Sequence, residues 1–356
     1  MFREAAHFRH MARGLLREGT QTIGAMVFSP EESSMTWAHV IDDLAAGQVL
    51  TEGEAETLFA AVFDDGVPDL ELGALLALIE QRRLTAQELV GVLAALSTRV
   101  FQLVPPETQW RPVLMPSYSG LREQPNLLPL LALSLQRLGI PVLMHGMLSG
   151  ERGVAAAYVL REMGIMPCAS LAQAQQELQA GHLAFVPTGA LAPALADLLA
   201  LRVRLGGGAL ARMLARLADP FAGHALQLVP AEHAQERAVL QSLLCDSERT
   251  ALLFETRDGD PVVDAQCRPC IELVRDGAAR SLFEAEVTPR CAHPLPDAHD
   301  PKATARWIAS VLEGRIPMPA PVANQIACCL YGSGYAQDIN QAKAIAAVET
   351  GSLAAA

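Results

Sequence analysis

The sequence predicts an α/β protein in two parts: a helical N-terminal domain, then a larger α/β domain with a mainly parallel central sheet. Two observations support this prediction. Between Thr36 and Val100, apolar residues recur at helical spacing. From Pro112 onward, short apolar runs that suit strands alternate with helical segments, which is typical of a parallel sheet. The chain, with 356 residues, has ample length for the cores of both parts.

Residues 1–35 are predicted to form an appended arm, and residues 36–100 a helical domain. Thr51 and Thr85 are each followed three residues later by a glutamate, the capping-box pattern that opens a helix. The predicted helices of this domain run from Trp37 to Gly47, Thr51 to Phe63, Pro68 to Glu80, and Thr85 to Val100.

Residues 101–350 are predicted to form the α/β domain. Its strands are expected at Val113–Ser117, Pro141–Met144, Leu183–Val186, Ala225–Val229, Ala251–Glu255 and Ile271–Val274. Its main helices are expected at Leu127–Leu138, Gly153–Met163, Leu171–Ala180, Leu191–Arg202, Lys302–Glu313, Val322–Tyr331 and Asp338–Thr350.

The composition indicates a protein without a membrane segment. Although 51% of the residues are hydrophobic, no apolar run reaches the roughly 18 to 20 residues that a bilayer span needs. The first residues show no apolar signal segment, so we expect a cytoplasmic protein. The seven cysteines, an odd number, suit reduced thiols.

Cys267 and Cys270 form a CxxC pattern, with Cys291 and His293 downstream. A zinc or redox site is one interpretation of this pattern. The favoured interpretation is that Cys267 and Cys270 are two thiols on a surface loop, because Cys291 and His293 are too closely spaced to form a convincing second ligand pair.

The net charge of −12 is unevenly distributed along the chain. Residues 31–81 contain twelve acids and no Lys or Arg, so the rest of the chain is neutral in sum. Nearly all the positive charge is arginine, whose guanidinium suits phosphate, although a coding bias would give the same composition. Nucleic acid is therefore not excluded as a partner.

Three passages carry a family resemblance. Residues 113–129 run as strand, glycine loop and helix, and residues 140–146 add a strand that ends in His145-Gly146. Asp65–Leu76 contains an acidic-glycine turn followed by Leu-Gly-Ala-Leu-Leu, in which Gly73 and Ala74 would allow close helix packing. Together these passages resemble the anthranilate phosphoribosyltransferase (TrpD) family of glycosyltransferase family 3. The resemblance covers about residues 36 to 350 and implies a homodimer that forms through the helical domain.

The frame of the family's diphosphate loop is kept, but most of the chemical groups are not. The resemblance implies a vestigial phosphoribosyl diphosphate loop at Ser117, Gly120, Asn126, His145 and Gly146. The family's loop aspartate corresponds to Leu121, its metal-binding serine to Leu128, and its lysine to Met144. We therefore expect no catalytic residues, no metal and no cofactor. Magnesium is expected only if the enzyme alternative holds, which is phosphoribosyl transfer to anthranilate or a related nitrogen nucleophile.

Two further family signatures are degenerate. Arg202 is the candidate for the arginine that contacts anthranilate in the family, but the Arg-Thr pair that follows is Gly208-Ala209 here. Asp258-Gly259 matches the start of a magnesium-binding motif whose Asp-Glu pair is absent. Asp260 and Asp264 are displaced from that pair and are expected to cap a turn.

The loop Pro116–Leu127 is similar to that of a TrpD-like subgroup (YbiB-type) that binds nucleic acid instead. The resemblance implies a non-catalytic protein that binds nucleic acid with little sequence preference, through arginine–phosphate contacts in the inter-domain groove. The nucleic acid is expected to be single-stranded or to be bound without sequence specificity. In the alternatives, Tyr118 is a packed loop residue, or the remodelled pocket holds a small molecule. The acidic residues 31–81 would have to lie away from the groove. The candidate binding residues are Tyr118, Arg122, Arg202, Arg204, Arg212 and Arg216.

Overall fold

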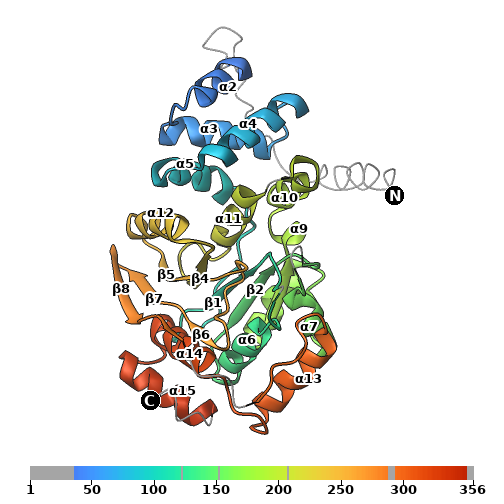
Figure 1. The fold of residues 1–356 in the computed structure, drawn as a ribbon, viewed down its shortest axis with the longest axis vertical. Helices are drawn as coiled ribbons and strands as arrows, with labels where there is room; N and C mark the ends of the chain where they lie inside the picture. Colours follow the sequence, from blue (N-terminus) through green and yellow to red (C-terminus); the bar gives the residue numbers. More distant parts are fainter. Residues whose placement is uncertain (1–35, 122, 151–152, 207, 288–292, 351–356) are drawn as a thin grey trace.

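The fold is that of a computed structural model, which describes residues 36–121, 123–150, 153–206, 208–287 and 293–350. The predicted arm 1–35, the candidate Arg122 and Cys291 lie outside these residues. Figure 1 shows a helical part stacked on a larger part that contains the sheet, which confirms the predicted fold class.

The helical part consists of α2 (Trp37–Ala45), α3 (Glu52–Phe63), α4 (Asp69–Arg82) and α5 (Ala86–Ser97). Both predicted capping boxes are present, at Thr51 and at Thr85. A Cβ on Gly91 in α5 would lie 2.0 Å from the Glu52 carbonyl oxygen, so Gly91 lets α5 pack against the start of α3. The sequence predicts close helix packing at Gly73 and Ala74, but the atom nearest to a Cβ on Gly73 is a Leu205 methyl group at 3.7 Å, so glycine is not required there.

In the described part of the chain, seven strands form one sheet in the order β3-β2-β1-β4-β5-β7-β8, of which the first five are parallel. β7 is antiparallel to β5, and β8 is antiparallel to β7. The strands are β1 (Val113–Ser117), β2 (Val142–Gly146), β3 (Ala184–Pro187), β4 (Leu226–Ala231), β5 (Thr250–Glu255), β7 (Ile271–Arg275) and β8 (Ala278–Phe283). β6 (Cys267–Arg268) and β9 (Glu286–Val287) pair separately. Each predicted strand is present within a few residues of its expected bounds.

Helices cover both faces of the sheet (Figure 1). One apolar core lies beneath α6, α7, α13, α14 and α15. The other core continues from the sheet through α10, α11 and α12 into the helical part, so the two parts of the protein share buried contacts. The remaining helix bounds are α6 (Leu128–Arg137), α7 (Ala156–Glu162), α8 (Leu171–Gln179), α9 (Thr188–Leu191), α10 (Pro193–Leu205), α11 (Ala209–Leu217), α12 (Ala234–Cys245), α13 (Pro301–Leu312), α14 (Ala320–Ser333) and α15 (Ile339–Thr350).

Among the described residues, no helix combines the length and apolar character that crossing a membrane requires.

Candidate functional site

The two loop motifs found in the sequence are brought together at the carboxyl ends of β1 and β2. Ser117 and Gly146 are partners in the parallel register of these strands. A Cβ on Gly146 would lie 1.8 Å from the Ser117 carbonyl oxygen, so only glycine fits beside that backbone. The retained glycine of the His145-Gly146 pair thus has a steric role in the sheet.

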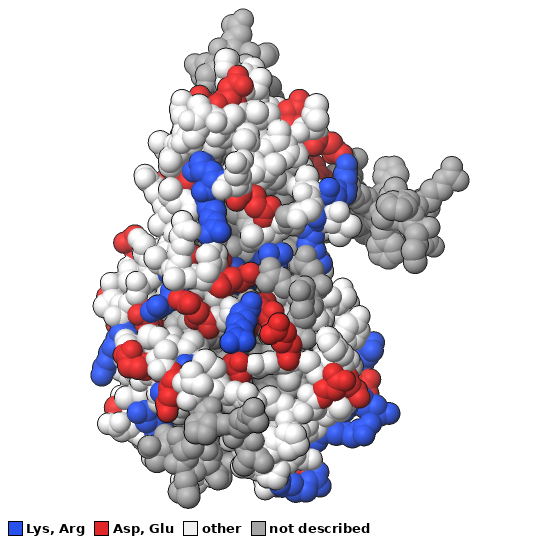
Figure 2. Space-filling model, viewed as in Figure 1, with Lys and Arg blue, Asp and Glu red and all other residues white. Residues whose placement is uncertain are grey.

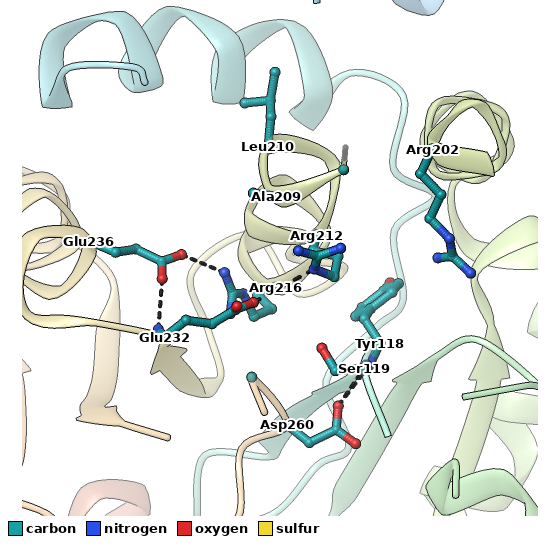
Figure 3. Close-up of polar contacts among 12 residues, drawn as sticks. Tyr118, Ser119, Arg202, Ala209, Leu210, Arg212, Arg216, Glu232, Glu236 and Asp260 are labelled. Carbon is teal, nitrogen blue, oxygen red and sulfur yellow. Dashed lines mark hydrogen bonds and ion pairs between the residues drawn. The ribbon is translucent and has the colours of Figure 1, made fainter. Parts of the chain in front are cut away.

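The loop after β1 surrounds a carboxylate from the protein itself. Oδ1 of Asp260 accepts hydrogen bonds from the backbone N–H groups of Tyr118 and Ser119, both at 3.0 Å (Figure 3). Oδ2 accepts from the Gly120 N–H at 3.2 Å, and from Asn126 Nδ2 at 3.2 Å. The Ser117 hydroxyl donates to Oδ2 at 3.3 Å. Backbone N–H groups that converge in this way bind anions, and here they bind Asp260.

Asp260 is therefore more than the turn cap that we predicted. Its side chain is 0% exposed, and burial raises its pKa, while the hydrogen bonds that it accepts oppose this rise. Each of the five hydrogen-bonding groups donates to the carboxylate, so both oxygens are fully used as acceptors. The predicted loop residues Ser117, Gly120 and Asn126 thus hold an internal anion.

Tyr118 was predicted as a nucleic-acid-binding residue, but its side chain is buried. Its side chain is 1% exposed, and its hydroxyl lies 2.9 Å from Nδ1 of His145, with the two rings edge to face. His145 is 0% exposed, and burial lowers its pKa to about 3, which leaves the imidazole in this hydrogen bond neutral. The alternative from the sequence, a packed loop residue, describes Tyr118 in this structure.

Arg212 and Arg216 are paired with acidic residues of the protein. Their side chains are 8% and 3% exposed. Arg216 pairs with Glu236 and lies 3.4 Å from Glu232, while Arg212 lies 3.6 Å from Glu232 (Figure 3). The spacing of four residues places both arginines on one face of α11, but both side chains are buried there and face Glu232 and Glu236. We therefore correct their assignment as exposed phosphate-binding residues.

Arg202 and Arg204, near the end of α10, remain accessible to different degrees. Arg202 is partly buried and donates to the Met147 sulfur at 2.9 Å. The Arg204 side chain is 68% exposed and lies 3.5 Å from Asp69 on α4. Figure 2 shows basic and acidic side chains intermixed over this face instead of a continuous basic strip. Of the predicted binding arginines that the structure describes, only Arg202 and Arg204 on α10 thus remain accessible.

Glu80, one of the acids in residues 31–81, reaches into the groove between the two parts. Its Oε1 accepts from the N–H of Gly208 at 2.7 Å and from that of Leu210 at 3.3 Å, and it also contacts the N–H of Ala209. These N–H groups open α11, where the helix dipole favours an anion. The expectation that the acidic segment lies away from the groove is thus wrong for Glu80.

Glu80 lines two hollows in this groove. The larger hollow, about 350 Å³, lies between the end of α4 and the helices α11 and α12. Arg83 spans its rim and contacts His233 and Gln235. The smaller hollow is also lined by Arg202.

The residues at the loop do not fit a magnesium–diphosphate complex. Leu128 has no atom that can bind a metal, and both oxygens of Asp260 already accept N–H and O–H groups. Cys267 and Cys270 have free, half-buried thiols, and the described residues contain no group of three or more acids, histidines and cysteines arranged to hold a metal.

The roles of Glu80, Glu232 and Glu236 were not predicted from the sequence, and the role predicted for Asp260 was incomplete. A signal was available for Asp260, because it follows the retained Asp258-Gly259 pair at a strand end of the same sheet. The three glutamates carry no comparable signal, because their partners lie on other helices.

Comparison with known proteins agrees with this architecture. Residues 38–99 match the helical bundle domain of the glycosyl transferase family. The chain is 35% identical over 311 residues to the uncharacterized protein YbiB of Escherichia coli K12, covering 86% of this chain and 97% of that protein. It is 26% identical to an anthranilate phosphoribosyltransferase of Methylocella silvestris, covering 86% and 89% of the two chains.

Solved structures give the same answer for the fold. Anthranilate phosphoribosyltransferase (TrpD) of Thermus thermophilus superposes with a TM-score of 0.71 at 20% identity, covering 88% of this chain and 95% of that one. The Saccharomyces cerevisiae enzyme, in complex with PRPP and Mg, gives 0.69 at 12% identity, covering 91% and 95%. By its extended similarity to YbiB and its fold, the chain belongs to the TrpD-like glycosyltransferase family 3 proteins.

Proposed function

We propose that this chain is a non-catalytic member of its family that binds nucleic acid, with little sequence preference, through arginines beside the inter-domain groove. The observation that carries the non-catalytic part is the position of Asp260. Its carboxylate takes up the N–H groups of the loop that the family resemblance gives to a diphosphate. A second anion there would meet like charge and find these donors already engaged.

The nucleic-acid part is supported by the similarity of the loop Pro116–Leu127 to the YbiB-type subgroup and by the cations near the groove. Arg83 is exposed at the rim of the larger hollow, Arg202 lines the smaller one, and Arg204 lies two residues beyond. Guanidinium groups suit phosphate oxygens, and contacts to phosphate give affinity without reading bases. Arg212, Arg216 and Tyr118 have no part in this revised interface.

Fluorescence anisotropy of a labelled single-stranded oligonucleotide, titrated across a salt series, tests the proposal. Binding is expected to weaken as salt rises, by about 0.7 in the log–log slope for each phosphate contact. Replacing Arg83, Arg202 and Arg204 by alanine should remove up to three contacts, lower the slope by about 2, and leave the melting temperature nearly unchanged. A failure of the unmodified protein to bind at low salt rejects the proposal.

A variant with the same change in charge at the far end of the molecule is the control. Arg161 on α7, with Lys302 and Arg306 on α13, are exposed there (Figure 1). Replacing all three by alanine should leave the salt slope unaltered. An equal loss in both variants would mean that net charge, and not the groove, determines binding.

Calorimetry with phosphoribosyl diphosphate and magnesium tests the non-catalytic part separately. We expect no binding at millimolar ligand. Magnesium-dependent binding, followed by transfer to anthranilate, would replace the proposal with the enzyme alternative.

The proposal includes a homodimer that forms through the helical part, as the family resemblance implies. Leu70 on α4 is 83% exposed, and a second copy would cover such an apolar side chain. Light scattering after size exclusion should give twice the mass of the chain. The mass of a single chain at micromolar concentration would contradict this part.

A further inference from the structure

The larger hollow of the groove, about 350 Å³ in volume, is lined in part by apolar side chains. These are Ile79, Leu84, Leu210, Met213 and Val239, from the end of α4 and from α11 and α12. Met213 and Val239 are only half-buried, so a molecule bound in the hollow would cover apolar surface that is now open to water. A space of this size suits a flat ring system with part of a sugar.

Polar groups border this apolar floor. The Glu80 carboxylate lines the hollow, and hydrogen bonds from the described residues reach only its Oε1, at the start of α11. Its Oε2 is therefore left to accept an N–H group of a ligand, and the Gln235 amide lies at the same hollow. A hydrocarbon chain would desolvate both groups without matching them. A nucleobase has apolar faces for the floor and a polar edge for these two side chains.

Arg83 supplies a cation at the mouth of the hollow. Its exposed guanidinium contacts His233 and Gln235, and in the described part of the chain it forms no ion pair with an acid. Its backbone has a φ of 66° and a ψ of 153°, a combination that residues other than glycine rarely adopt. Strained backbone of this kind is concentrated at ligand sites, and a guanidinium suits a phosphate group.

The nearby acids of α12 are engaged with arginine and leave Arg83 available. Glu236 pairs with Arg216, and Glu232 lies 3.4 Å from the same guanidinium. The hollow is also separate from Arg202, to which the family resemblance gives anthranilate, because Arg202 lines the smaller hollow. The larger hollow thus combines an apolar floor, an open acceptor and a cation at its mouth.

From these contacts we propose that the larger hollow is a nucleotide pocket, which takes one base of the bound strand while Arg83 binds the phosphate of the same nucleotide. This inference rests on the proposed function and names the unit that is recognised. A single strand suits such a pocket, because an unpaired base leaves its stack at low cost. The pocket holds a single base, so the strand as a whole is still bound with little sequence preference.

Calorimetry with nucleoside monophosphates and with the matching nucleosides tests the pocket in the full-length protein at low salt. The probes carry adenine, guanine, cytosine or uracil. At least one monophosphate should bind, and about tenfold more tightly than its nucleoside, because the nucleoside lacks the charged partner of Arg83. In Arg83→Ala the two ligands should bind equally, with the affinity that the nucleoside has for the unmodified protein.

Filling the hollow provides a second test. Met213→Trp should place a ring where the base would lie and abolish measurable binding of monophosphate and nucleoside alike. Met166→Trp is the matched control, because it makes the same change at a side chain that is 61% exposed and does not line the hollow. It should bind both ligands like the unmodified protein. Arg83→Ala alters an exposed side chain, so its result holds even if Met213→Trp does not fold.

The outcomes separate this pocket from the proposed function. A lack of monophosphate binding at millimolar ligand overturns the pocket, and so does a folded Met213→Trp variant that binds like the unmodified protein. Equal affinities of monophosphate and nucleoside for the unmodified protein overturn the role of Arg83. If the labelled oligonucleotide still binds in these cases, the proposed function stands without the pocket. Monophosphate binding that Met213→Trp abolishes, in a protein that does not bind the oligonucleotide, supports the pocket and rejects the proposed function.

Discussion

Arg216 on α11 and Glu236 on α12 form an ion pair that is almost closed to water, with side chains 3% and 9% exposed. Glu232 approaches the same guanidinium at 3.4 Å, and its carboxylate also lies near Arg212. Desolvated charges are tolerated when they are paired, and the loss of one partner leaves the other uncompensated. Arg216 consequently links α11 to α12, and its charge is already balanced by carboxylates of the protein.

Replacing Arg216 by alanine should lower the free energy of unfolding by about 3 to 5 kcal/mol, because Glu236, which is 9% exposed, would stay buried without its cation. Urea denaturation measures this loss. Arg204→Ala is the matched control: its partner Asp69 is 85% exposed, so the change should stay within about 0.5 kcal/mol. A loss below about 1 kcal/mol for Arg216→Ala would contradict the structural role.

The sequence indicated where the arginines of α11 lie, but not what they face. Two arginines four residues apart share one side of a helix whether that side meets water or a neighbouring helix. Their burial depends on Glu232 and Glu236, whose positions are set by the way α12 packs on the sheet. A pattern along one helix carries no information on a partner supplied by another, so charge spacing alone suggested a basic surface.

The sheet was more predictable than the site, because its parallel strands are buried apolar runs. Of the hairpin formed by β7 and β8, only β7 was predicted, although the turn between the strands carries a clear sequence signal. Asp276 and Gly277 have φ values of 53° and 76°, which is the turn geometry that an Asp-Gly pair favours between antiparallel strands. β8 itself is mostly exposed, and Arg280 and Ser281 in its middle interrupt the apolar run by which the other strands were recognised.

The buried imidazole of His145 predicts a specific response to acid. Burial lowers its pKa from 6.5 to about 3, so the folded protein keeps it neutral while the unfolded chain binds a proton. Its contribution to stability is therefore intact above pH 6.5 and is lost progressively as the pH falls toward 3. Lowering the pH from 7.5 to 5 should reduce the free energy of unfolding by about 2 kcal/mol through this group alone.

The variant His145→Asn measures how much of the pH dependence of stability comes from His145. Asparagine can accept a hydrogen bond from Tyr118, but it does not titrate. Urea denaturation of both proteins over this pH range should show a smaller decline for the variant, whatever the stability at neutral pH. Parallel declines would mean that His145 is already protonated, or accessible to water, in the folded state.

Gly146 should tolerate no side chain. Alanine there would bring its Cβ within 1.8 Å of the Ser117 carbonyl oxygen, a backbone atom that cannot move without shifting β1. We expect a loss of about 3 kcal/mol or more, at the upper end for overpacked sites, measured by thermal or urea denaturation. Gly53→Ala is the opposite case, because nothing lies within 4 Å of a Cβ on that exposed position of α3. It should gain about 0.5 to 1 kcal/mol. A neutral result at Gly146 would contradict the close approach of β1 and β2.

Glu80 on α4 is expected to stabilise the contact between the helical part and the α/β part. Its carboxylate is the acceptor for the N–H groups of Gly208 and Leu210, which have no partner within α11 because they open that helix. Glu80→Ala should therefore cost about 1 to 2 kcal/mol, the usual effect of losing a helix cap. Hydrogen exchange at residues 208–210 should become faster, while exchange in the sheet core changes only with global stability.

Glu80→Gln separates the hydrogen bonds from the charge. Its amide oxygen can still accept from the first turn of α11, but it lacks the negative charge that the helix dipole favours. This variant should lie between the unmodified protein and Glu80→Ala, both in stability and in exchange at residues 208–210. If exchange there is the same in all three proteins, the start of α11 is protected by packing alone, and Glu80 does not join the two parts.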